Sequence, residues 1–165
     1  MKGCSSHPKR LHLPAAAVAW LTLIRTFSSE VRSPVTTPHQ ISEAELRTAA
    51  AEAAHHPRCT NCAPLWRPGW ESISGAVSID HLALLGALGS EASWERLDEF
   101  HPDGTHLWSP DAPIALGWHP YTRSRLWQCA QCSGAFLRYT EYGGYYVEER
   151  IRPLLADLIV NPEHP

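Results

Sequence analysis

Residues 125–152 read RLWQCAQCSGAFLRYTEYGGYYVEERIR, and this stretch decides the fold. Aromatic and β-branched residues are concentrated in three segments, at 125–128, 135–141 and 145–152, which predicts three strands. A Cys-x-x-Cys sequence separates the first two segments, and Gly143-Gly144 separates the last two. The stretch therefore predicts a strand, a cysteine knuckle and a β-hairpin.

The two glycines also predict the register of this hairpin. A two-residue type I′ turn needs positive φ at both central positions, which glycine adopts without strain. One of the pairs that result joins opposite charges, which favours a hairpin. The expected pairs are Tyr142 with Tyr145, Thr140 with Val147, Arg138 with Glu149, and Phe136 with Ile151.

The segment before the first cysteine pair carries clear helix signals. Ser42 and Glu45 have the spacing of a capping box. In this motif the serine side chain binds the backbone amide of the glutamate, and the glutamate side chain binds the backbone amide of the serine. Good helix formers follow, and Pro57 limits the helix to about His55. We therefore expect a helix that begins after Ser42 and delivers the chain to the first cysteine pair.

Weaker signals predict the other elements. The apolar run at 81–88 follows a capping residue, Asp80, and we expect a second helix there and a short third one around Trp94. Alternating apolar residues at 114–118 predict a strand, and 154–160 a last short helix or strand. The expected fold class is α+β, with a helical N-terminal half and an antiparallel C-terminal sheet.

Length and charge suggest how the chain is organised. The 165 residues suffice for one domain, and prolines at 34 and 38 predict a linker. We expect a basic, poorly ordered arm and linker over 1–38 and a single domain over 39–165. The apolar stretch at 11–24 is compatible with a secretory signal, an amphipathic helix or an extension outside the fold.

The charge is divided unevenly between these parts. Residues 1–35 have a formal charge of +4, whereas the rest holds nine arginines, no lysine and 16 acids, a charge of −7. An acidic body disfavours general binding to a nucleic-acid backbone. No apolar run is long enough to predict a membrane-spanning helix.

The cysteines carry the strongest chemical signal. Cys59 and Cys62 form one CxxC pair, Cys129 and Cys132 form another, and 66 residues separate them. Two such knuckles supply the four thiolates of a tetrahedral Zn²⁺ site, so we expect one structural zinc ion. Two alternatives stay open, namely two disulfides in an oxidising compartment, or redox-active or unpaired thiols.

Other residues near the pattern have minor roles in this prediction. A histidine could replace one sulfur ligand, and the candidates are His55, His56 and His119. Cys4 lies in the basic arm and is expected to be a free thiol. Gly134 follows the second knuckle and is expected to provide the backbone freedom that the exit from a knuckle needs.

Residues 125–152 together with the Cys59 knuckle resemble half of a zinc ribbon, in which a strand enters a CxxC knuckle and a hairpin follows. The long spacer departs from compact ribbons and implies an insertion between the ligand pairs. The segment 136–146 is similar to one found in small bacterial proteins, a likeness that implies no activity.

These observations favour a non-catalytic, zinc-binding protein-interaction or regulatory module of the cytoplasm. Four thiolates close the metal's coordination shell, and the chain lacks the motifs of zinc deaminases, zinc proteases, serine hydrolases and phosphate-binding loops. We therefore expect no enzyme activity. Trp66, Trp70, Trp108 and the hairpin tyrosines are candidates for a protein interface.

The alternative function is binding of single-stranded nucleic acid by the C-terminal sheet. Arginines interleaved with aromatic residues can bind phosphates and stack on bases. The residues expected to form this surface are Arg123, Arg125, Trp127, Arg138, Tyr139, Tyr146, Arg150 and Arg152.

Overall fold

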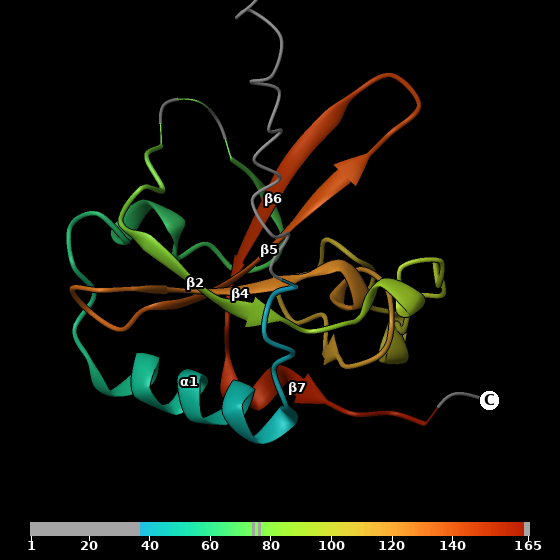
Figure 1. Ribbon diagram of the computed structural model, residues 1–165, viewed down its shortest axis with the longest axis horizontal. Coiled ribbons are helices and arrows are strands. Elements are labelled where there is room, and N and C mark those ends of the chain that lie inside the picture. The colour runs from blue at the N-terminus through green and yellow to red at the C-terminus, as the bar shows by residue number, and fades with distance from the viewer. Residues whose placement is uncertain (1–36, 74, 76, 164–165) are drawn as a thin grey trace, which may run out of the picture. The chain divides into compact units, whose positions relative to one another are not determined.

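The computed structural model of the protein describes residues 37–73, 75 and 77–163 (Figure 1). The predictions for Cys4, for the stretch at 11–24 and for most of the arm lie outside the described residues. The body from Thr37 onward forms one compact unit, and all that follows concerns this unit.

A five-stranded antiparallel sheet forms the centre of the fold, in the order β1-β6-β5-β4-β2. A short parallel pair, β3 with β7, and one α-helix, α1, complete it, so the fold class is α+β as predicted. The bounds are α1 Glu43–His55, β1 Glu71–Ser72, β2 Leu82–Ala87, β3 Ile114–Ala115, β4 Arg125–Cys129, β5 Ala135–Tyr142, β6 Val147–Pro153 and β7 Ile159–Val160.

The sheet separates two hydrophobic clusters. Successive side chains of a strand point to opposite faces, and on β5 Leu137 and Tyr139 pack into a cluster with α1, whereas Phe136 packs into one with the cysteines. Helix α1 contributes its apolar stripe, Leu46, Ala49, Ala50 and Ala53, to the first cluster. Figure 1 shows α1 running along one side of the sheet. The cysteines therefore lie on the opposite face.

The predicted start of α1 is confirmed in detail. The Ser42 hydroxyl accepts a hydrogen bond from the Glu45 amide, and the Glu45 carboxylate accepts one from the Ser42 amide at 2.8 Å. The helix ends at His55, two residues before Pro57. This helix brings the chain to the first cysteine pair.

The helix predicted over 81–88 is wrong, because this segment forms strand β2. Leu82 lies opposite Cys129 in an antiparallel ladder with β4, which a bulge interrupts between Leu84 and Gly86. A Cβ atom at Gly86 would overlap the backbone carbonyl of His39. The residue thus allows the chain before α1 to lie against this strand, and pairing with distant residues overrides the local helix signals.

Two other predicted elements are shorter than expected. The third helix is a single 3₁₀ turn, Glu91–Ser93. The strand predicted over 114–118 ends after Ala115, because the chain turns at Gly117, where φ is +82°. The last segment contains both predicted alternatives, a 3₁₀ turn at Ala156–Leu158 followed by β7. Among the described residues, the segment before β4 therefore has one α-helix and more strand than we predicted.

The hairpin between β5 and β6 exists, but its predicted register is wrong by two residues. Tyr142 pairs with Val147 and Thr140 with Glu149, so the loop has four residues, 143–146. The Gly143 amide donates to the Tyr146 carbonyl at 2.9 Å, and the Tyr146 ring lies where a Gly143 Cβ would be, 2.5 Å away. Packing of this ring inside the loop explains the longer turn.

A shift by two leaves every side chain on its predicted face. Arg138 now lies opposite Ile151, yet it still forms an ion pair with Glu149 across the diagonal, at 3.3 Å. Diagonal neighbours in a sheet remain within reach of long side chains. The predicted charge pairing therefore survives the change of register.

Candidate metal centre

The first knuckle begins just after α1. The amides of Cys62 and Ala63 both donate to the Cys59 carbonyl, at 3.1 and 3.0 Å, and a 3₁₀ turn, Ala63–Leu65, continues from it. These bonds turn the backbone so that two sulfurs separated by two residues face one point. Cys62 and Leu65 pack with Phe136 of β5, which holds this knuckle against the sheet.

The second knuckle forms where β4 ends. The Ser133 amide donates to the Cys129 carbonyl at 3.0 Å, and the Cys129 amide donates to the Gly134 carbonyl at 2.9 Å. Ser133, rather than Gly134, has the left-handed conformation, with φ at +53°. A Cβ atom on Gly134 would lie 3.3 Å from the Cys132 sulfur and 3.4 Å from the Phe136 ring. Gly134 is thus needed for close packing around the sulfurs.

The two knuckles bring all four sulfurs together. The Sγ atoms of Cys59, Cys62, Cys129 and Cys132 lie within 4.8 Å of one another, and those of Cys59 and Cys129 are 3.9 Å apart. Four sulfurs about 2.3 Å from one tetrahedral ion are about 3.8 Å apart, whereas a disulfide has about 2.05 Å. All four are free cysteines, so the spacing fits a metal and no disulfide.

Because the four sulfurs are largely buried, they require a nearby cation to be stable as thiolates. Cys62, Cys129 and Cys132 are buried and Cys59 is half-buried. Burial, and then the three neighbouring thiols, hold the pKa of Cys62 well above its ordinary value. A bound divalent ion supplies the positive charge that a cluster of thiolates requires. The donor set therefore fits a metal ion that prefers sulfur.

A histidine that the sequence analysis missed lies next to the sulfurs. His81 Nε2 is 3.4 Å from the Cys62 sulfur. The sequence predicts a helix for this segment. In the structure it forms strand β2, and pairing of this strand with β4 brings His81 beside the cysteines. None of the three predicted histidines belongs to the four-residue group, and His119 instead packs 6.0 Å from the ring of Tyr139.

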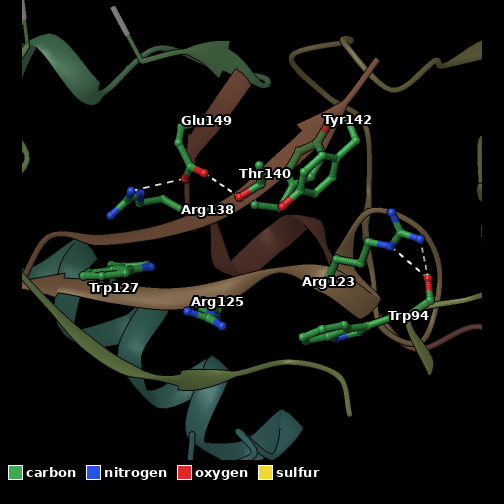
Figure 2. Close-up of a pocket in the computed structure, with 9 residues that line it drawn as sticks. Trp94, Arg123, Arg125, Trp127, Arg138, Thr140, Tyr142 and Glu149 are labelled. Carbon is green, nitrogen blue, oxygen red and sulfur yellow. Dashed lines mark hydrogen bonds and ion pairs between the residues drawn. The ribbon is translucent and has the colours of Figure 1, made fainter. Parts of the chain in front are cut away.

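A second site lies on the sheet, and it gathers part of the predicted binding surface. A pocket of about 530 Å³ is lined by Arg125, Trp127, Arg138 and Tyr139 (Figure 2). It also holds the predicted Arg123 and one residue that the sequence analysis did not assign to this surface, Trp94, which follows an irregular turn with no periodic signal. The other lining residues are Thr140, Tyr142 and Glu149.

The remaining predicted binding residues are engaged outside this pocket. Arg150 forms ion pairs with Glu141 and Glu148 at 2.9 and 2.7 Å, and its guanidinium lies over the Trp108 ring. The Tyr146 hydroxyl donates to Glu141 at 3.2 Å. Arg152 is buried, so the predicted residues do not form one continuous surface.

The three tryptophans predicted for a protein interface lie in different environments. Trp70 is buried and packs edge-on against Tyr139, and Trp66 is half-buried and packs against Phe136. Trp108 is 40% exposed. Two of the three thus belong to the core, which leaves Trp108 and the hairpin tyrosines at the surface.

The chain was compared with models of protein families, with curated proteins and with solved structures. No family model, no curated protein and no solved structure matches this chain. Among the residues that the structure describes, no helix has the length and apolar character required to cross a membrane.

Proposed function

We propose that the four cysteines bind one Zn²⁺ and that this ion is structural. The observation that carries the proposal is the convergence of four sulfurs, three of them buried, from knuckles 66 residues apart in the chain. Such an ion ties the segment after α1 to the end of β4. Free thiols at this spacing suit a reducing compartment, so we place the protein in the cytoplasm.

The same geometry supports a non-catalytic role. Catalytic zinc usually has three protein ligands and an open position for water or substrate. Four thiolates would fill the tetrahedral shell, and His81 Nε2 lies 3.4 Å from the Cys62 sulfur. Chemistry at the metal therefore has no place to occur, and the domain acts by binding.

Chelation tests whether the ion is structural. The zinc-loaded protein is treated with a chelator and followed by circular dichroism and limited proteolysis. Because binding free energy becomes folding free energy, we expect loss of the native spectrum and rapid cleavage between the two knuckles. A metal-free protein that keeps its spectrum and protease resistance contradicts the structural role.

We propose further that the partner is another protein and that the tip of the β5–β6 hairpin contacts it. Tyr145 is fully exposed, Tyr142 is 71% exposed, and Val147 is 66% exposed. Exposed aromatic and apolar side chains gathered at one loop are typical of the centre of protein interfaces.

Site-specific photo-crosslinking tests the protein partner. A photoreactive residue at position 145 is compared with one at position 51, which is exposed on α1. We expect a discrete crosslinked product from position 145 in cells and none from position 51. The same products from both positions contradict the proposal.

The second candidate function is binding of single-stranded nucleic acid. The pocket favours it, because Arg125, Trp127 and Arg138 lie together there. Two observations count against an extended binding surface for a strand. The residues after position 35 have a net charge of −7, and two carboxylates already bind Arg150. Titration with a single-stranded oligonucleotide at low and moderate salt separates the two, since phosphate contacts weaken steeply with salt.

A further inference from the structure

The pocket on the sheet is positively charged within an acidic body. Three arginines, at positions 123, 125 and 138, line it, against a single carboxylate, Glu149. That carboxylate is already engaged, because it pairs with Arg138 at 3.3 Å and accepts a hydrogen bond from the Thr140 hydroxyl. The lining therefore carries two positive charges that no lining carboxylate compensates.

Two of these arginines lie opposite each other on neighbouring strands, which is unfavourable in a sheet. Arg125 on β4 is directly opposite Arg138 on β5, and like charges in directly opposed positions destabilise a sheet. Burial, opposed by Glu149 and reinforced by Arg125, lowers the pKa of Arg138. The Arg138 Nε atom is buried with no hydrogen-bond partner among the described residues. An anion between these strands would relieve the repulsion.

Aromatic rings accompany the charges. The Arg138 guanidinium lies over the Trp127 ring, 4.3 Å from its centre, which orients both groups. Trp94 is 40% exposed, and its carbonyl accepts a hydrogen bond from Arg123 Nε at 2.8 Å. Figure 2 shows Arg125 between Trp127 and the Arg123–Trp94 pair, with Tyr142 across from it. Flat apolar surfaces thus lie beside the cationic groups.

We propose that this pocket binds a phosphate monoester attached to a planar ring, as in a nucleotide. A phosphate monoester carries between about −1.5 and −2 charges at neutral pH, which matches the two uncompensated positive charges better than a carboxylate does. Arginine binds phosphate through several parallel hydrogen bonds. The ring would stack on an exposed tryptophan, and a volume of about 530 Å³ is within the range of small-molecule sites.

This inference concerns a different ligand from the protein partner proposed for the hairpin tip, and Tyr142 belongs to both surfaces. The nucleotide could be free or be the 5′-phosphorylated end of a single strand, since both carry a phosphate monoester. Trp127 also packs against the cysteine cluster, so loss of the metal would disturb the pocket. The test therefore uses the zinc-loaded full-length chain.

Calorimetry with four probes tests the proposal: uridine 5′-monophosphate (UMP), uridine, inorganic phosphate and a short 5′-phosphorylated oligothymidylate. We expect UMP to bind at least about tenfold more tightly than uridine or phosphate alone, because it engages both the arginines and a ring. An oligothymidylate that binds more tightly than UMP identifies a strand as the source. One that binds equally or more weakly identifies a free nucleotide.

Two variants locate the binding. Arg125 is exposed, so Arg125→Gln should fold normally and weaken UMP binding at least about tenfold. Trp94→Ala should weaken binding of UMP but not of phosphate. Arg67→Gln, an exposed arginine outside the pocket, is the matched control and should change nothing.

Three results overturn the proposal. The first is no binding of UMP at millimolar concentration. The second is binding of UMP no tighter than that of phosphate or uridine. The third is an affinity for UMP that is the same in Arg125→Gln as in the unaltered chain.

Discussion

Cys129 joins the sheet to the proposed metal centre. It is the last residue of β4, it pairs with Leu82 on β2, and its sulfur belongs to the four-sulfur cluster. A structural zinc in isolated modules contributes on the order of 10 kcal/mol, against ~5–15 kcal/mol for the stability of a whole domain. A change at this one atom should therefore affect the whole domain.

We expect Cys129→Ser to lose the metal and to unfold or aggregate, because a hydroxyl does not replace a thiolate ligand. Metal analysis and thermal unfolding measure both effects. Cys4→Ser is the control, since Cys4 is outside the two CxxC pairs, and it should retain metal and melting temperature. A Cys129→Ser protein with normal melting would show that the cluster does not stabilise the fold.

Gly89 is a second position where one added atom should change the stability of the domain. A Cβ atom here would overlap the Thr122 carbonyl and lie 2.6 Å from the Ser93 hydroxyl oxygen. Because backbone must move to make room, Gly89→Ala should lower the free energy of unfolding by about 1–3 kcal/mol. Gly144→Ala, where a Cβ meets nothing within 4 Å, is the control for denaturant unfolding. Equal stability of the two variants would contradict the close approach.

Helix α1 owes its first turn to a reciprocal cap. Hydrogen bonds from the Ser42 side chain and then the Ser42 amide, followed by one with His39, lower the pKa of Glu45 from 4.5 to about 2. A lowered pKa means that this contribution is present above the ordinary carboxyl pKa and is lost as the pH falls through about 2.

Ser42→Ala should therefore raise the pKa of Glu45 toward 4.5, measured by an NMR titration of its carboxyl carbon. Thr48→Ala is the control, because its hydroxyl binds the Ala44 carbonyl within the helix and not Glu45. An unchanged titration of Glu45 in Ser42→Ala would show that the cap does not form in solution.

The elements that could be predicted are those that carry local signals. The capping box predicted α1, the CxxC pairs predicted both knuckles, and Gly143-Gly144 predicted a hairpin. Strand β2 could not be predicted in this way, because the short apolar run at 82–88 has no decisive period and pairing with β4 determines its structure. The register failed for a similar reason, since contacts of the Tyr146 side chain lengthened the turn.

The same limit applies to the two candidate sites. The cluster of four cysteines was predicted from spacing alone, because a CxxC pair is a local feature. The pocket was predicted only in part. Arg123, Arg125, Trp127 and Arg138 come from one short stretch of the sequence, whereas Trp94 reaches the pocket from a distant turn that only the folded chain brings there.

The molecule as a whole divides into the described body and residues 1–36. The prolines at 34 and 38 and the opposite net charge of residues 1–35 predict that the body folds without them. Deleting 1–35 should leave the melting temperature of the zinc-loaded protein nearly unchanged in differential scanning calorimetry. A large fall would show that the stretch at 11–24 belongs to the core.

The central claim is that one zinc ion organises the body through four thiolates. Native mass spectrometry of untagged protein, purified without added metal, tests it most directly. We predict one zinc per chain and a polypeptide mass, after acid release of the metal, that retains every cysteine hydrogen. A chain without metal, or one lighter by four hydrogens because two disulfides have formed, would contradict the account.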